Sequence, residues 1–201
     1  MDKSNMNNLV KQGYNLAADN YAVGRDMFKN SKYLDIFDEK IKPGSIILDI
    51  GCGNGNPVDK YLSDHGHSII GIDISEKQIE LAKKNFPNQT FELKDMSEVQ
   101  MGKFRVDAVV SFYAIFHIPK EEHARLFEKI NSFLPVGGYM LITLGADDWE
   151  GSEDNFFGAK MYWSQNTPED NIKFINEAGF EIILNEMDMS GNEKHNVIIA
   201  K

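Results

Sequence analysis

Short apolar runs alternate with amphipathic segments through most of the chain. The run over 45–50 (SIILDI) is rich in β-branched residues, which is typical of a strand buried on both faces of a sheet. Residues 75–86 instead show helical spacing of apolar positions, with Ser75 as N-cap and Gln78 at the capping-box position. In this way the pattern predicts seven strands, over 45–50, 68–73, 89–93, 106–112, 139–144, 180–188 and 195–200. The predicted helices are two within 5–40 and one each over 57–65, 75–86, 120–134 and 168–178.

The order of these elements predicts the fold class. Strands separated by helices form parallel βαβ units. The last two predicted strands are joined only by 189–193, which is too short for a parallel crossover, so they form an antiparallel pair. We therefore predict an α/β fold with a seven-stranded, doubly wound, Rossmann-like sheet, one antiparallel strand, helices on both faces and an N-terminal helical cover. Ligands bind such sheets at the carboxyl ends of the strands, near the first strand.

The composition of the chain limits the kinds of partner that we expect it to bind. The chain has 21 Lys and Arg against 31 Asp and Glu, a net charge of −10, which argues against a nucleic-acid partner. A single cysteine, Cys52, leaves no intramolecular disulfide and no cysteine-based zinc site, and the five histidines lack metal-ligand spacing, so no metal is expected. The polar N-terminus and the absence of a long apolar window favour a cytoplasmic protein without a membrane partner.

Residues 49–57 (DIGCGNGNP) form the first candidate ligand site. Its alternate glycines are Gly51, Gly53 and Gly55. Glycines directly after a strand permit positive φ and let a ligand approach the backbone closely. The dinucleotide fingerprint G-x-G-x-x-G is not met, because Asn56 stands where its last glycine is required. The carboxylate of Asp49 suits a cationic amine better than a pyrophosphate, which it would repel.

Two further carboxylates follow neighbouring strands. Asp73 ends the second predicted strand and can accept both hydroxyls of a ribose, with capping of the next helix as the alternative role. Asp95, followed by Met96, can accept a hydrogen bond from the amino group of an adenine, although a loop aspartate is often only solvated.

These residues resemble the successive motifs of class I S-adenosylmethionine-dependent methyltransferases, in the branch that methylates small molecules. The matching segments are ILDIGCGNG, GIDIS, KDMSE, VDAVVSFYAIFH and LPVGGYMLIT, and the resemblance extends over about 10–200. It implies S-adenosylmethionine as cofactor, held by the glycine turn at its methionine part, by the Asp73 position at its ribose and by the Asp95 position at its adenine. The cofactor-binding residues expected on this basis are Tyr21, Asp49, Gly51, Cys52, Gly53, Gly55, Asp73, Ile74, Asp95, Met96 and Ser111, with Phe112 as the alternative to Ser111 at the end of the fourth strand.

The same resemblance divides the single domain, 1–201, into parts. These are an N-terminal helical cover or lid at 1–42, a cofactor-binding core at 43–144, an acceptor-side insertion at 145–166 and the C-terminal part of the sheet at 167–201. The segment 12–25 resembles the family's lid helix, whose tyrosines, here Tyr14 and Tyr21, cover the cofactor.

The chain departs from one branch of the family after the fourth strand. The N/D-P-P-Y/F signature of amino-group methylation of bases and amides is absent, since 112–119 reads FYAIFHIP. This argues against a DNA or glutamine methyltransferase. His117 in this segment is the candidate general base, because an imidazole titrates near neutrality. Its alternative role is packing or capping. His123 is predicted to face outward from the next helix.

The insertion at 145–166 is rich in aromatic and acidic residues. We expect Trp149, Tyr162 and Trp163, together with Tyr14, to bind the acceptor; the alternative is a satellite hydrophobic cluster. The acidic residues between 147 and 154 can attract a cationic acceptor, and the alternative is a solvated acidic loop.

The resulting hypothesis is S-adenosylmethionine-dependent methyl transfer to a small-molecule acceptor, neutral or cationic. Two alternatives stay open at this point. One is a non-catalytic S-adenosylmethionine-binding module, and the other is a nicotinamide-dependent oxidoreductase on a similar sheet.

Overall fold

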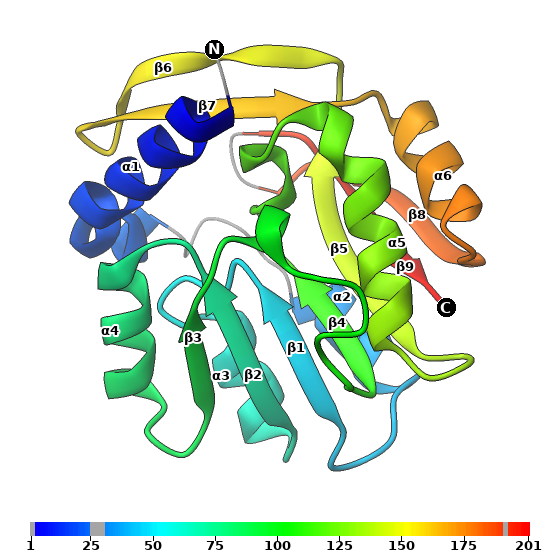
Figure 1. Ribbon diagram of the computed structural model, residues 1–201. Coiled ribbons are helices and arrows are strands. Elements are labelled where there is room, and N and C mark those ends of the chain that lie inside the picture. The colour runs from blue at the N-terminus through cyan, green and yellow to red at the C-terminus, as the bar shows by residue number, and fades with distance from the viewer. Residues whose placement is uncertain (1–2, 25–30, 191–192) are drawn as a thin grey trace.

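The computed structural model describes residues 3–24, 31–190 and 193–201, and it contains a seven-stranded sheet in the order β3-β2-β1-β4-β5-β9-β8 (Figure 1). The strands of this sheet are β1 (Ile46–Ile50), β2 (Ser68–Asp73), β3 (Thr90–Leu93), β4 (Ala108–Ser111), β5 (Tyr139–Gly145), β8 (Ile182–Asp188) and β9 (His195–Ala200). β1 to β5 are mutually parallel, and β9 runs antiparallel to both β5 and β8. The predicted fold class, including its one antiparallel strand, is confirmed.

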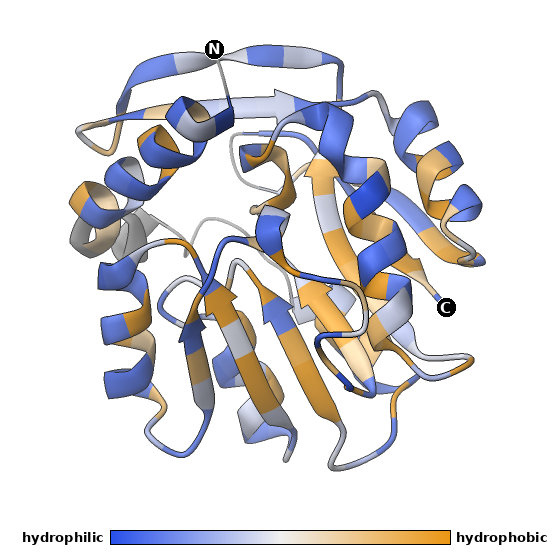
Figure 2. Ribbon diagram, in the orientation of Figure 1, coloured by the Kyte–Doolittle hydropathy of each residue, from blue (hydrophilic) through white to orange (hydrophobic). Residues whose placement is uncertain are grey.

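Helices cover both faces of the sheet. The α-helices are α1 (Lys3–Gly24), α2 (Ser31–Asp38), α3 (Val58–Asp64), α4 (Glu76–Asn85), α5 (His123–Phe133) and α6 (Pro168–Glu177), and the short 3₁₀ helices are η2 (Met96–Glu98), η3 (Ile115–His117) and η4 (Lys120–Glu122). Residues of α5 and α6 share one core with Leu48 and Ile50, whereas residues of α2 and α3 share the other core with Ile47. Figure 2 shows the central strands mostly in hydrophobic colours. This matches strands that are buried on both sides.

The helix starts follow the local signals in the sequence. Ser75 caps α4 by accepting a hydrogen bond from the Gln78 backbone N–H, at 3.1 Å. The side chain of Gln78 has no hydrogen-bond partner within the described part, so only half of the capping box forms. None of the described helices is long and apolar enough to cross a membrane.

The insertion contains a second, two-stranded sheet that the sequence analysis did not predict. β6 (Trp149–Phe156) and β7 (Ala159–Gln165) form an antiparallel hairpin. Figure 1 shows this hairpin lying across the carboxyl ends of the parallel strands, above α1. β6 is mostly exposed, and β7 is buried chiefly where Met161 and Tyr162 pack against Met6 and Val10 of α1. The hairpin was not predicted from the sequence, because the burial of its side chains depends on α1, which lies far away along the chain.

Close packing between α1 and β7 depends on Gly13. A Cβ atom at this position would lie 2.7 Å from the Met161 methyl group and 2.9 Å from the Lys160 carbonyl oxygen. The methionine can move, but the carbonyl belongs to the β7 backbone. Any larger residue at position 13 must therefore push the helix away from the hairpin.

We expect Gly13→Val to loosen α1 from the hairpin and to destabilise the protein by about 1–3 kcal/mol, the usual cost of overpacking. Thermal unfolding and hydrogen exchange of the α1 amides would measure the effect. Leu16→Ala is the matched control, since Leu16 lies on the same helix with 74% of its surface exposed. Equal unfolding temperatures and equal α1 exchange in the Gly13→Val and Leu16→Ala proteins would contradict the prediction.

Candidate functional site

A cavity lies where the carboxyl ends of β1 to β4 meet α1. It is lined by the glycine turn after β1, by residues following β2, β3 and β4, and by the α1 side chains Asn7, Val10 and Tyr14. This is the edge of the sheet where a doubly wound fold binds its ligands.

The glycine turn follows β1 and forms one wall of the cavity. Gly51 and Gly53 line the cavity with φ of +77° and +55°, in the left-handed region that other residues rarely adopt. A Cβ atom on residue 51 would stand 2.2 Å from the Cβ atom of Ala114, so only glycine fits there. Cys52 also lines the cavity, and burial raises the pKa of its thiol well above the usual range. A ligand can therefore approach the backbone of this turn very closely.

Asp73 stands beside this turn at the end of β2. One of its carboxylate oxygens accepts the Gly53 N–H at 2.9 Å, and the other accepts the Ser75 N–H at 2.8 Å. The contact with Ser75 corresponds to the capping role, but a carboxylate has about four acceptor positions and can also receive two hydroxyls. Burial raises the pKa of Asp73 to about 6.

Asp95 lies beyond Asp73, after β3, and lines the cavity with its neighbour Met96 and with Ile74, which follows β2. Its carboxylate accepts the Ser97 N–H at 2.8 Å and contacts the side-chain amide of Asn7 from α1. The helix that covers the cavity is therefore tied to this carboxylate. The sequence analysis did not select Asn7, which sits among other polar residues near the N-terminus.

Three predicted cofactor-binding residues do not line the cavity. Asp49 points into the buried layer below the turn, where it contacts Asp59 and, together with burial, raises the pKa of that carboxyl. Gly55 faces Phe86, whose ring would lie 2.5 Å from an added Cβ atom. Ser111 is fully buried and donates its hydroxyl to the Ile50 carbonyl at 2.7 Å. The side chain of a fourth, Tyr21, lies outside the described part of α1.

His117 and Tyr14 meet at the opposite end of the cavity. His117 Nδ1 lies 2.7 Å from the Tyr162 carbonyl oxygen, and its Nε2 lies 2.7 Å from the Tyr14 hydroxyl. Because a carbonyl oxygen can only accept, Nδ1 carries the hydrogen; Nε2 then accepts the Tyr14 O–H. Burial lowers the pKa of His117 to about 4, so the ring is neutral at pH 7.

The other predicted acceptor residues lie behind this pair. The Trp163 ring packs on His117 with 5.6 Å between centroids, and Trp149 packs on Trp163 at 6.2 Å with 39% of its surface exposed. Tyr162 is buried, and its hydroxyl donates to Glu150 at 2.8 Å. Only Tyr14 among the four predicted acceptor residues lines the cavity. The aromatic cluster thus supports His117 from outside.

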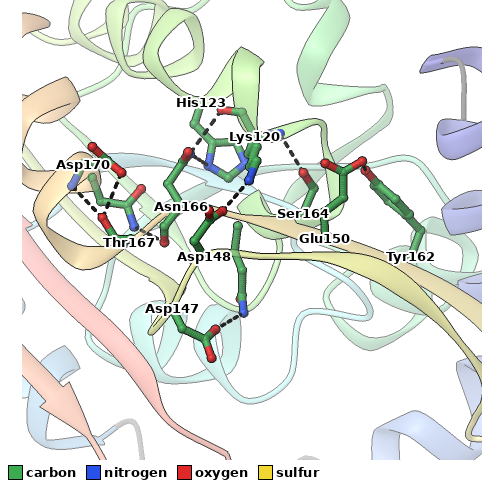
Figure 3. Close-up of polar contacts among 12 residues, drawn as sticks. Lys120, His123, Asp147, Asp148, Glu150, Tyr162, Ser164, Asn166, Thr167 and Asp170 are labelled. Atoms are coloured by element: carbon green, nitrogen blue, oxygen red, sulfur yellow. Dashed lines mark hydrogen bonds and ion pairs between the residues drawn. The ribbon is translucent and has the colours of Figure 1, made fainter.

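The acidic residues of the hairpin also point away from the cavity. Asp148 pairs with Lys120 and Glu150 with Tyr162 (Figure 3). Asp147 accepts a hydrogen bond from the side-chain amide of Gln165 at 2.6 Å. These contacts join the hairpin to itself and to η4, the short helix before α5. Asp147, Asp148 and Glu150 are therefore engaged in contacts within the protein.

His123 belongs to the same junction, and the prediction that it faces outward is wrong. Only 1% of its surface is exposed, and its Nδ1 lies 3.1 Å from the Asn166 side-chain nitrogen. Burial lowers the pKa of His123 to about 4. The residue that follows the hairpin, Asn166, covers this face of α5, and this contact is not visible in the local helical pattern (Figure 3).

Several residues at the cavity were not selected from the sequence. Tyr113 and Ala114 follow β4 and line the cavity, as does Lys94 after β3; Phe112, the predicted alternative to Ser111, lines it as well. Tyr113 has φ of +56°, a conformation that its sequence does not indicate. No group of three or more His, Cys, Asp or Glu residues in the described ranges is placed to hold a metal ion.

Comparison with known proteins finds similarity to methyltransferases. Residues 47–138 match the family described as "Methyltransferase domain". With the observed fold, this match confirms the resemblance to class I S-adenosylmethionine-dependent methyltransferases over the central part of the chain.

Individual relatives share the fold at low sequence identity. A protein of Anoxybacillus flavithermus, named an uncharacterized methyltransferase, is 30% identical over 122 residues, which cover 57% of each chain. The 1,6-didemethyltoxoflavin-N1-methyltransferase of Burkholderia thailandensis, solved with 1,6-didemethyltoxoflavin and S-adenosylhomocysteine, aligns with a TM-score of 0.77 and 16% identity, covering 100% of this chain and 90% of that chain. An S-adenosylmethionine-dependent methyltransferase of Methanosarcina mazei aligns with a TM-score of 0.71 and 20% identity, covering 82% and 95%. The chain spans 57–59% of the length of the first two curated relatives.

Proposed function

We propose that the protein transfers a methyl group from S-adenosylmethionine to a small-molecule acceptor. One observation carries this proposal: the glycine turn, Asp73 and the Tyr14–His117 pair all line the same cavity. The Burkholderia neighbour, which was solved with a small molecule and S-adenosylhomocysteine, supports a small-molecule acceptor.

The residues present fit the proposed cofactor. Gly51 and Gly53 form a cradle that a Cβ atom at position 51 would fill, and Asp73 keeps acceptor positions for two hydroxyls. Asn56 stands where the dinucleotide fingerprint requires its last glycine, which disfavours a nicotinamide-dependent oxidoreductase. The carboxyl of Asp49 is buried under the glycine turn. Asp49 is therefore proposed to affect the methionine part of the cofactor only indirectly, by supporting the turn.

S-adenosylmethionine supplies, when bound, a methyl group already activated on a sulfonium. The protein then has to orient the acceptor and keep water away, which is catalysis by proximity. α1 and the hairpin cover the cavity and provide this exclusion. The Tyr14 hydroxyl, whose hydrogen points to His117, presents its oxygen lone pairs to an acceptor O–H or N–H. A proton released by the acceptor can pass to the Tyr14 oxygen while the Tyr14 proton moves to Nε2 of His117.

Calorimetric titration tests the cofactor, and product formation tests the reaction. We expect saturable heat with S-adenosylmethionine and with S-adenosylhomocysteine, and none with NAD or NADH. Turnover to S-adenosylhomocysteine across a panel of hydroxyl and amine acceptors is then expected to exceed the rate without acceptor. Cofactor binding without turnover on any acceptor would favour the non-catalytic binding module, and heat only with NAD or NADH would end the proposal.

A further inference from the structure

Tyr113 adopts a strained backbone conformation at the wall of the cavity. Its φ is +56°, its relative exposure is 5%, and its N–H donates to the Thr143 hydroxyl at 2.6 Å. A bulky residue in the left-handed region is strained and persists where the surrounding structure fixes it. Such residues concentrate at binding and catalytic sites. Tyr113 is not used by the Tyr14–His117 pair.

A buried histidine holds the ring of Tyr113. His195, the first residue of β9, meets this ring edge-on, with 4.6 Å between centroids and 79° between planes. The other side of the histidine stacks on Phe116 at 5.9 Å. Nε2 of His195 lies 3.4 Å from a carboxylate oxygen of Glu193, and this contact lowers the pKa of Glu193. Glu193, His195 and Tyr113 therefore form a chain of contacts from the surface to the cavity.

The strand order assigns the two ends of the cavity. Asp95 follows β3, Asp73 ends β2 and the glycine turn follows β1, so the proposed adenine, ribose and methionine contacts lie in sequence across the sheet. Tyr113 follows β4, on the side of β5 and β9, and lies beyond the methionine end. The acceptor must enter from this side, because the methyl group is carried next to the methionine part.

Charge is distributed unevenly between these two ends. Within the described lining, the charged side chains are Asp73, Lys94 and Asp95, and all three follow β2 or β3. The described lining after β4 consists of aromatic, aliphatic and neutral polar groups, including the neutral ring of His117. A charged acceptor would lose its hydration there without gaining a partner of opposite charge.

We propose that Tyr113 forms one wall of the acceptor subsite, that His195 and Glu193 position it, and that this subsite takes an uncharged planar ring with an O–H or N–H donor. The inference rests on the proposed function, because it assigns the end of the cavity that S-adenosylmethionine leaves open. Tyr113 contacts the acceptor in the ground state, whereas Glu193 acts only through His195.

Binding to the complex with S-adenosylhomocysteine tests the acceptor class. The probes are phenol, 4-hydroxybenzoate and 4-(trimethylammonio)phenol, which share one ring and differ in charge, and NMR titration measures their dissociation constants. We expect phenol to bind at least several-fold more tightly than either charged probe. Preference for the cationic or the anionic probe would overturn the acceptor class, and so would failure of all three rings to bind.

Variants test the residues. We expect Tyr113→Leu to weaken phenol binding roughly tenfold, through loss of ring contacts. Glu193→Gln should weaken it about two- to fivefold, as for a partly exposed ion pair. Neither should change the affinity for S-adenosylhomocysteine. With an acceptor that turns over, both should raise KM and retain kcat, which a general loss of stability would not do. Glu181→Gln is the control, because Glu181 pairs with Lys201 at 3.2 Å at a different exposed position.

The failures of the two proposals are distinguishable. If S-adenosylhomocysteine does not bind the wild-type protein, the proposed function fails and this inference fails with it. If it binds, but Tyr113→Leu weakens cofactor and phenol equally, Tyr113 belongs to the cofactor end and only this inference is overturned. Unchanged phenol binding in both variants has the same consequence.

Discussion

Replacing Tyr14 by phenylalanine is expected to lower kcat about 100-fold, at the lower end of the range for general acid–base groups. The change removes only a hydroxyl, which in the structure joins the cavity to Nε2 of His117 at 2.7 Å. Without it, the acceptor loses both its hydrogen-bond acceptor and its route for the proton. Initial rates of S-adenosylhomocysteine formation would measure kcat, and calorimetry would show a cofactor Kd within a few-fold of the wild-type value.

His117→Ala is expected to produce a similar loss, and the double variant Tyr14→Phe/His117→Ala is expected to be little worse than either single one. Groups that act as one unit give strongly non-additive effects. The matched control is the surface pair of Tyr61 on α3 and His65 just after it, whose rings stack at 4.0 Å. Tyr61→Phe and His65→Ala should leave kcat unchanged. Normal turnover in His117→Ala would remove it from the mechanism, and losses that multiply in the double variant would show that the two residues act separately.

The main sheet was predictable from sequence because its signals are local. Each central strand is a short apolar run, and turns or capping residues such as Ser75 mark where helices begin. The carboxyl ends of these strands meet at one edge whatever the loop details, so Asp73 and the glycine turn could be placed together in advance. This part of the site follows from chain order alone.

The acceptor end could not be predicted in the same way, because its geometry comes from distant segments. His117 receives Tyr14 from 103 residues earlier in the chain and the Tyr162 carbonyl from 45 residues later. These contacts fix its tautomer and its protonation state, which a single-residue view of histidine leaves open. The direction of the Asp49 side chain also depends on the pleat of β1, which turns Ile47 and Asp49 toward the α3 layer.

Asp73 provides the second large expected effect. We expect Asp73→Ala to raise the Kd for S-adenosylmethionine about 5- to 150-fold, corresponding to about 1–3 kcal/mol for lost hydrogen bonds to a charged group. The substitution removes the proposed acceptor of the ribose hydroxyls. It also removes the hydrogen bonds that the carboxylate accepts from the Gly53 and Ser75 N–H groups. The turn and the ribose contact are thus lost together. Calorimetric titration of both proteins would measure the change.

Asp107→Ala is the matched control, since the Asp107 carboxylate also accepts a backbone N–H, from Ile46 at 2.8 Å, but at the opposite edge of the sheet. It should alter stability without altering cofactor affinity. An unchanged Kd in Asp73→Ala, or an equal change in Asp107→Ala, would end the ribose assignment.

The pH dependence of binding separates Asp73 from His117. Burial raises the pKa of Asp73 to about 6 in the free protein, and a protonated carboxyl accepts hydroxyl hydrogen bonds poorly. Cofactor affinity should therefore be full above pH 6 and should fall as pH drops through about 6, because binding favours the ionised form. His117, with a pKa of about 4, stays neutral over the same interval and leaves kcat unchanged. This loss of affinity at low pH, the acid limb of the profile, should appear in the Kd of the wild-type protein. It should be absent from Asp73→Asn, whose weaker affinity should not change with pH over this interval. An acid limb near pH 6 that appears in kcat instead would assign the titrating group to the reacting end of the cavity.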